Sequence, residues 1–201
     1  MIEIVLITNF SYRRIPCPYP WNKNNCEGVR FQNAIQHCTE KHRKTENLQK
    51  DQFGWFHKSY NLNPDLLRKG FVLPVVTMEV EGITIISAAD AYSDPNIYYQ
   101  WVKIIGNSEE AKNWRFELKY EGQNSKSYIF ESAVESIDES NDSIMSNFKC
   151  FSIPYKALKA QYLDENLKIS YSIRIRNLKS EAFEDAKNDN EESGISDVDE
   201  E

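Results

Sequence analysis

Residues 114–120 read WRFELKY, and this short stretch decides the class of fold. Every second residue in it is apolar: Trp114, Phe116, Leu118 and Tyr120. A period of two places the apolar side chains on one face of a β-strand and the charged side chains on the other. Residues 167–176, LKISYSIRIR, repeat the pattern near the end of the chain. Both segments therefore predict strands with one buried face and one solvent-facing side.

Five further segments have the length and composition of strands. They are VTMEV (76–80), ITIIS (83–87), YYQWVKII (98–105), SYIFE (127–131) and KCFSI (149–153). Turn-rich links such as SDPN (93–96) and EGQNSK (121–126) separate them. Many short strands at this spacing predict a mainly β chain folded as an antiparallel sandwich. One late helix is predicted over PYKALKAQYL (154–163), with Pro154 at its first position.

The charge of the chain is concentrated at its end. The 201 residues carry a formal net charge of −7. Residues 181–201 hold ten acidic residues and one basic residue, Lys187, which leaves +2 for residues 1–180. A near-neutral body of this kind is not typical of proteins that bind nucleic acids. The acidic segment has almost no large apolar side chains, so we predict a disordered tail over residues 179–201.

The first ten residues, MIEIVLITNF, do not indicate a membrane or secreted protein. The segment is too short to span a bilayer, and it lacks the basic region and cleavage site of a signal peptide. We therefore expect an intracellular protein, located in the cytoplasm or also in the nucleus, that does not bind membranes. In such a reducing compartment, clustered cysteines favour a metal site over disulfides.

The N-terminal region concentrates the residues that bind metals. The segment CPYPWNKNNCEGVRFQNAIQHCTEKH (17–42) contains three of the four cysteines and two of the three histidines. Cys17 and Cys26 flank a loop rich in Pro and Asn, and His37 and His42 follow on a predicted helix. Zinc is bound tetrahedrally by thiolates and imidazoles in loop-and-helix pairs of this type.

Spacing alone leaves the ligand set open. Eight residues separate Cys17 from Cys26, whereas about two to four are usual in zinc fingers. His37 and His42 have the spacing of a zinc-finger pair, but Cys38 and His42, four positions apart, form the cleaner pair on a helix. The alternative to a metal site is an ordinary helix with a buried Cys38 and surface histidines.

Three segments in this order resemble the seven-in-absentia (SINA/SIAH) family of RING-type ubiquitin ligases. They are the cysteine–histidine segment above, YYQWVKIIGNSEEAKNWRFELKYEG (98–122) and SNFKCFSIPYKALKAQYLDENLKISYSIRI (146–175). The second contains the family's strand end at Ile105-Gly106, its Ala-x-Asn-aromatic turn at 111–114 and its ELxxxG strand at 117–122. The third is similar to the family's closing strand, helix and strand.

The resemblance implies a domain organisation and a cofactor. It implies a SIAH-type zinc finger at residues 17–45 and a TRAF-like antiparallel β-sandwich at residues 48–178. An N-terminal extension (1–16) and the acidic tail (179–201) flank them. It also implies one Zn²⁺ ion held by Cys17, Cys26, His37 and His42, with Cys38 as the alternative ligand.

The resemblance further implies that the sandwich binds protein partners. Members of the family dimerise through the sandwich and add extended peptides as a strand to the edge of a sheet. The segment DQFGWFHKSYNL (51–62) is similar to the strand that borders this groove. The candidate partner contacts are Trp55, Phe56, His57, Lys58 and Ser59, although Trp55 and Phe56 are equally well interpreted as core residues.

One departure from the family concerns peptide specificity. The family's Asp-Trp pair, which helps to hold a peptide, would fall near DLLRKGF (65–71), where Leu67 and Arg68 stand instead. The preference for particular peptides is therefore expected to differ or to be lost.

We expect a zinc-binding interaction module that resembles the substrate-binding part of a SINA/SIAH ligase. It would recruit proteins for ubiquitin-dependent degradation or regulate a RING-containing relative. The sixteen residues before Cys17 contain no RING, the part that recruits the ubiquitin-conjugating enzyme. An active ligase is therefore expected only as a dimer with a RING-bearing partner. A nucleic-acid-binding zinc finger is a weaker alternative.

Other chemistry has little support in the sequence. No glycine-rich phosphate-binding loop is present among the seven glycines. We interpret His57 as a packed or edge histidine of a strand, and Cys150 as a core thiol. No catalytic residue is predicted.

Overall fold

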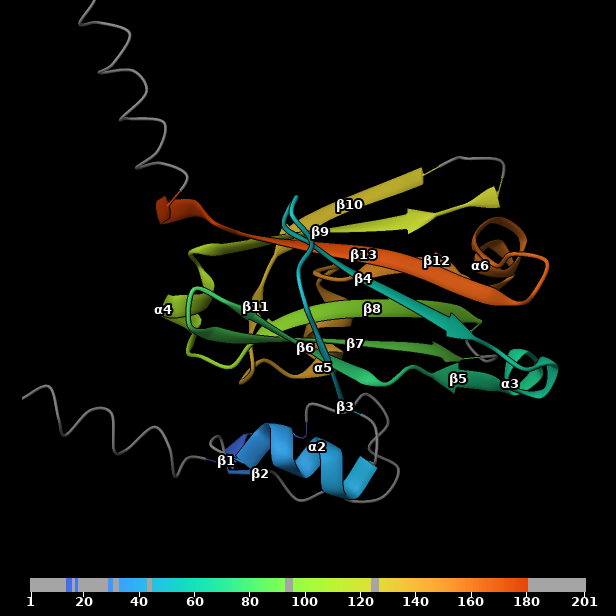
Figure 1. Ribbon diagram of the computed structural model, residues 1–201. Coiled ribbons are helices and arrows are strands. Elements are labelled where there is room, and N and C mark those ends of the chain that lie inside the picture. The colour runs from blue at the N-terminus through green and yellow to red at the C-terminus, as the bar shows by residue number, and fades with distance from the viewer. Residues whose placement is uncertain are drawn as a thin grey trace, which may run out of the picture.

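Two β-sheets packed face to face form the body of the protein (Figure 1). The computed structural model describes residues 14–15, 17, 29–30, 33–42, 45–92, 96–123 and 127–180. Over these residues the prediction of a mainly β sandwich is confirmed. Each helix in them is too short or too polar to cross a membrane.

The smaller sheet has four antiparallel strands in the order β10-β9-β13-β4. The two alternating patterns form its central strands, β9 (Trp114–Glu121) and β13 (Lys168–Asn177). Its edges are β4 (Trp55–Asn61) and β10 (Ser127–Ala133). Phe116, Leu118 and Ile173 are fully buried on its inner face, as the period of two predicted.

The larger sheet contains seven strands, with the central order β11-β8-β7-β6-β3. Two more strands pair at the same edges, β12 with β8 and β5 with β7. The strands are β3 (Thr45–Leu48), β5 (Gly70–Val72), β6 (Val75–Val80), β7 (Ile83–Tyr92), β8 (Ile97–Ile104), β11 (Glu135–Ser136) and β12 (Phe151–Pro154).

This sheet differs from the prediction of a wholly antiparallel sandwich in two places. β3 pairs with β6 in parallel, and β11 pairs with β8 in parallel. In each pair, strands of the other sheet intervene along the chain, β4 in the first and β9 and β10 in the second. A long crossover of this kind allows parallel pairing, which a short hairpin does not.

The larger sheet is buried on both faces. On the face towards the smaller sheet, Met78, Ile85 and Tyr98 belong to the main core. On the opposite face an outer cluster is formed by Ile15, Cys17, Val29, Ala34, Cys38, Val75, Ile86, Ala88, Trp101, Ile137, Ile144 and Cys150. Cys150 is therefore a buried thiol, as predicted, although it lies one residue before β12.

An N-terminal module covers this second face. It consists of β1 (Arg14–Ile15), β2 (Val29–Arg30) and α2 (Ala34–His42). In Figure 1 it lies on the side of the larger sheet that points away from the smaller one, where α5 (Asn141–Ser146) also lies. Residues 1–13 and 181–201 are outside the described residues, and so is most of the predicted extension (1–16) and tail (179–201). Of these ranges, residues 14–15 form β1 and residues 179–180 are helical.

Short helices close the two ends of the sandwich (Figure 1). α3 (Pro64–Lys69) and α6 (Tyr155–Tyr162) lie at one end, where the Tyr155 hydroxyl donates to the Leu67 carbonyl at 2.9 Å. α4 (Ser108–Ala111) lies at the other end, and Asn107 caps it. The predicted late helix is α6. It begins at Tyr155, one residue later than predicted, so Pro154 is its N-cap and not its first helical residue.

Candidate functional site

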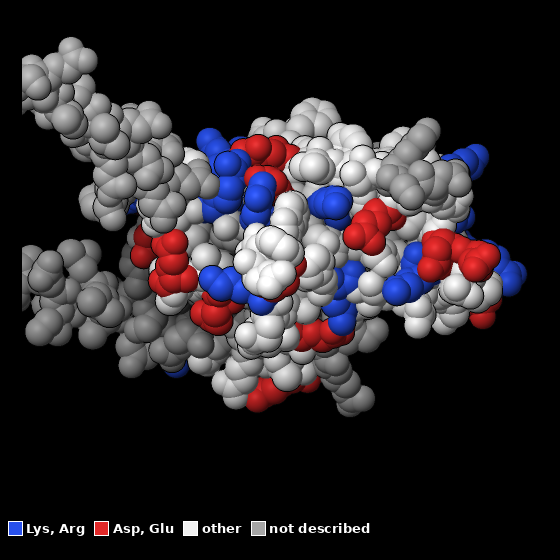
Figure 2. Space-filling view, turned by 45° about the horizontal axis from the view of Figure 1, so that its top comes forward, with Lys and Arg blue, Asp and Glu red and all other residues white. Residues whose placement is uncertain are grey.

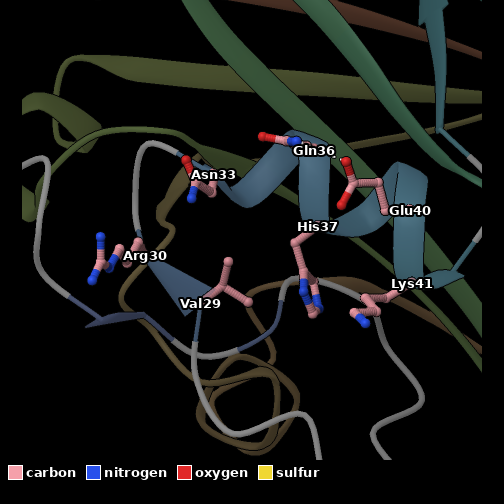
Figure 3. A pocket seen from close by; sticks show the side chains of 7 residues that line it. All are labelled: Val29, Arg30, Asn33, Gln36, His37, Glu40 and Lys41. Atoms are coloured by element: carbon pink, nitrogen blue, oxygen red, sulfur yellow. Dashed lines mark hydrogen bonds between the residues drawn. The ribbon is translucent and has the colours of Figure 1, made fainter.

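The structure brings together two of the predicted zinc ligands, which lie twenty positions apart in the sequence. Cys17 follows β1 and is buried, and His37 projects from α2 towards Val29 of β2 (Figure 3). The Cys17 Sγ and His37 Nε2 atoms are 3.3 Å apart. Ile15 of β1, two positions before Cys17, pairs with Val29 of β2. This pairing fixes β1 against β2.

The distance between Cys17 and His37 fits two ligands of one zinc ion. In a tetrahedral site, Zn–S bonds of about 2.3 Å and Zn–N bonds of about 2.0–2.1 Å place the two ligand atoms about 3.6 Å apart. Burial lowers the pKa of His37, and Lys41 lowers it further, while Glu40 acts in the opposite direction. The net result is a lowered pKa, which favours the neutral imidazole, the form of histidine that binds a metal.

Cys38 points to a different environment from His37. Its side chain is 0% exposed and belongs to the outer cluster, one helical turn after the buried Ala34. Cys26 and the side chain of His42 lie outside the described residues. Within the part of the chain that is described, no three His, Cys, Asp or Glu side chains converge as a metal site. The four-ligand set therefore stays a prediction.

A cavity of about 210 Å³ lies beside His37 (Figure 3). Its lining comes from β2 and α2 and comprises Val29, Arg30, Asn33, Gln36, His37, Glu40 and Lys41. Along α2, Gln36 Nε2 donates to Glu40 Oε1 at 2.7 Å. All of the lining residues except Val29 are polar or charged, with charges of both signs, whereas small-molecule sites are lined mainly by hydrophobic and aromatic residues.

β4, which carries the five predicted partner contacts, is an edge strand. It pairs along its whole length with β13 on one side. On the other side, a single bridge joins Phe56 to Lys50, and no described strand pairs with β4 beyond Phe56. Its outer N–H and C=O groups are therefore placed to pair with an added strand.

The five residues divide between the two faces of β4. Phe56 is 2% exposed and lies in the main core, so only its backbone is accessible to a partner. Lys58 also faces inward, where it forms an ion pair with Glu46 of β3 and lies 4.8 Å from the centre of the Tyr60 ring. Trp55, His57 and Ser59 alternate with them on the outer face of the smaller sheet.

Cross-strand contacts hold these outer side chains in place. The guanidinium of Arg174 stacks over the Trp55 ring at 4.8 Å. His57 Nδ1 is 2.8 Å from Ser172 Oγ, and Ser59 Oγ is 2.8 Å from Ser170 Oγ. The outer face of β4 is thus ordered before any partner arrives, which reduces the entropy lost on binding.

Asp51 is a part of this site that the sequence interpretation missed. Its carboxylate accepts from the backbone N–H groups of Phe53 and Trp55, at 2.8 and 2.9 Å, and contacts His57 Nε2 at 2.8 Å. These contacts lower the pKa of Asp51, and the contact with His57 has the largest effect. Gly54 completes the turn with a φ of +81°. The sequence signal was the Asp-x-x-Gly pattern of a turn directly before a strand.

Surface charge does not indicate a nucleic-acid site on the face shown in Figure 2. There, Lys and Arg alternate with Asp and Glu, with other residues between them. Nucleic-acid-binding proteins instead present a continuous basic patch or stripe.

Comparison with family models identifies part of the sandwich. Residues 83–172 match the family model described as Sina, TRAF-like domain. The matched range runs from the first strand residue of β7 into β13, so it covers most of the sandwich. The cysteine–histidine segment and β4 precede it. No curated protein matches the chain.

Proposed function

We propose that this protein is a protein-interaction module whose TRAF-like sandwich binds extended peptide segments at the outer edge of β4. Two observations carry the proposal: the Sina TRAF-like match over most of the sandwich, and the outer side of the edge strand β4, which has no described partner strand beyond Phe56. Backbone pairing would supply affinity, and the ordered outer side chains Trp55, His57 and Ser59 would supply selectivity.

The likeness to SINA-type domains suggests the wider role. The module would recruit proteins to a ubiquitin ligase or regulate one, as the substrate-binding part of such a ligase does. In this role it positions partners and needs no catalytic side chain of its own.

We also propose that a zinc ion stabilises the N-terminal module. Cys17, Cys26, His37 and His42 would hold it, and the 3.3 Å contact between Cys17 and His37 supports the first and third of these. When bound, such an ion supplies structural cross-linking of the module rather than reactivity. The burial of Cys38 in the outer cluster gives it a packing role and favours His37 as the ligand.

A peptide selection experiment tests binding at β4. Random extended peptides are selected on the full chain, and the affinity of a selected peptide is measured by fluorescence anisotropy. In the double variant Trp55→Ala/His57→Ala the affinity should fall about tenfold or more, which corresponds to about 1.4 kcal/mol. N-methylation of alternate peptide amides should also abolish binding, because it removes the backbone donors.

The matched control for this experiment is Lys119→Ala, on the outer face of the same sheet but two strands away from β4. It should leave the affinity unchanged. Equal affinity of a selected peptide for the wild type and the double variant would place the binding site elsewhere. Capture of a RING-type ligase by the same surface would favour the role in ubiquitin transfer.

A further inference from the structure

A second cavity lies at the α4 end of the sandwich, far from α3 and α6 (Figure 1). Its volume is about 400 Å³, and it is bordered by α4, the start of β9, the end of β10 and β11. Its charged wall residues are Lys112, Arg115, Lys149, Glu135 and Glu139. Three cations and two anions therefore face the cavity.

A buried cation, Lys103, lies behind the wall close to the two acidic residues. Lys103 is 1% exposed, and its ammonium donates to the Glu139 carbonyl and to Asn141 Oδ1, both at 2.7 Å. Burial lowers the pKa of Lys103 to about 8, while the carboxylates of Glu139 and Glu135 act to raise it. Glu135 also contacts Lys149 Nζ at 3.2 Å. Lys112 pairs in the same way with Glu109 of α4, at 2.6 Å. With Lys103 and Glu109 counted, four cations stand against three anions around the cavity.

Arg115 carries the part of this charge that has no counter-ion. It lies directly opposite Arg176 in the pairing of β9 with β13. Arg176 is compensated by Glu117 at 3.1 Å and Glu131 at 2.5 Å. No described residue forms an ion pair or hydrogen bond with the Arg115 side chain. Since like charges on opposite strand positions repel, an anion in the cavity would relieve the repulsion.

The described chain passes this cavity at Leu178 and ends at Ser180, whose hydroxyl lies 3.4 Å from the Glu81 carboxylate. The backbone N–H of Leu178 donates to the carbonyl of Asn113, at 2.8 Å, between the cavity residues Lys112 and Arg115. The next residues, 181–201, carry ten acidic side chains and one basic side chain. A short connection gives a tethered segment an effective concentration in the millimolar range, so even weak attraction leads to occupancy.

We propose that the cavity lined by Lys112, Arg115 and Lys149 is a binding site for carboxylate-rich segments, and that its occupant is this chain's own acidic segment, residues 181–201. The contact is between side-chain carboxylates and the three cations. It requires no apolar core, which the composition of the segment could not supply. An acidic segment of another protein would bind only by displacing it.

Carbodiimide cross-linking of the full chain tests the proposal, because this reagent joins amines to carboxylates that are in contact. Mass spectrometry should find Lys112 and Lys149 joined to acidic residues of 181–201. The yield should fall about tenfold between 0.05 M and 1 M salt, because the screening length falls to about 3 Å at 1 M. Mixing isotopically labelled and unlabelled chains shows whether a link lies within one chain or between two.

The variant Arg115→Glu should lower the yield of these links by about tenfold, and Arg115→Gln by less, because it removes the charge without reversing it. Lys156→Glu, an exposed charge reversal on α6 at the other end, is the matched control and should have no effect. Circular dichroism checks that each variant is folded.

The proposal fails if the links are absent, if they join different chains, or if they spread evenly over distant lysines such as Lys58 and Lys168. It also fails if Lys156→Glu lowers the yield as much as Arg115→Glu does.

Discussion

Lys103 is a charged side chain enclosed by the protein, and its position makes stability depend on pH. Its ordinary pKa of 10.5 is lowered to about 8, first by burial. Between these values the unfolded chain binds the proton more tightly than the folded chain does. The contribution of this residue to the free energy of unfolding therefore rises with pH. This sign is opposite to that of a lysine stabilised by an ion pair.

Comparison with Lys103→Met isolates this effect. From pH 7.5 to 9.5 the free energy of unfolding of the wild type should rise by about 2 kcal/mol relative to that of the variant. Urea denaturation at the two pH values measures it, and the use of a difference removes the contributions of tyrosines and thiols common to both proteins. A constant difference would mean that Lys103 keeps an ordinary pKa.

The sequence could group residues of the candidate site that lie in one short segment, but it could not tell which side of a helix or strand each of them faces. The sequence grouped Cys17 and His37 as candidate metal ligands, and the structure brings these two side chains into contact. It could not choose between His37 and Cys38, because which side of a helix is buried depends on what packs against it. It also left Phe56 open between a partner contact and a core residue, and the alternation within β4 directs Phe56 into the core.

At the scale of elements, β4 combines a buried face and the proposed binding edge in one strand. Phe56→Ala should lower the free energy of unfolding by about 3–5 kcal/mol, because it leaves a cavity in the main core. Ser59→Ala, three positions along on the outer face, should change it by less than about 0.5 kcal/mol. Denaturant titration of both variants distinguishes the faces. Similar losses in both would mean that the outer face is structural too.

Long strands were predictable from the sequence, and the shortest elements were not. The alternating segments became the centre of the smaller sheet, and VTMEV and ITIIS became parts of β6 and β7. β5, β11 and α3 were not predicted, because three residues, two residues and six residues contain too little periodicity. Their conformation depends on tertiary pairing, such as that of β5 with β7.

At the scale of the whole molecule, the N-terminal module and the sandwich share a hydrophobic cluster. Cys38 of α2 lies in it with Trp101 of β8, so the predicted boundary between residues 45 and 48 does not divide the packing. The sequence could not show this, since the continuous apolar runs of the larger sheet indicate only that both faces are covered. What covers the second face is visible only in three dimensions.

Removal of zinc tests the link between the two parts. A chelator should release about one zinc ion per chain and shift tryptophan emission to longer wavelength, because loosening of the module exposes Trp101. The variant Trp101→Phe should release zinc equally but show a smaller spectral shift, whereas Trp55→Phe should keep the full shift. A purified protein without zinc, or release without any shift, would contradict the proposed role of the ion.

The shared outer cluster also constrains how the chain folds as it is synthesised. Ile15, Cys17 and Cys38 leave the ribosome well before Ile86 and Trp101, the residues on which they pack. The module therefore has no apolar surface to dock on until β8 has been made, and in the meantime its own exposed apolar residues can attract chaperones or aggregate. A metal ion bound early would give the nascent module a fold of its own during that delay.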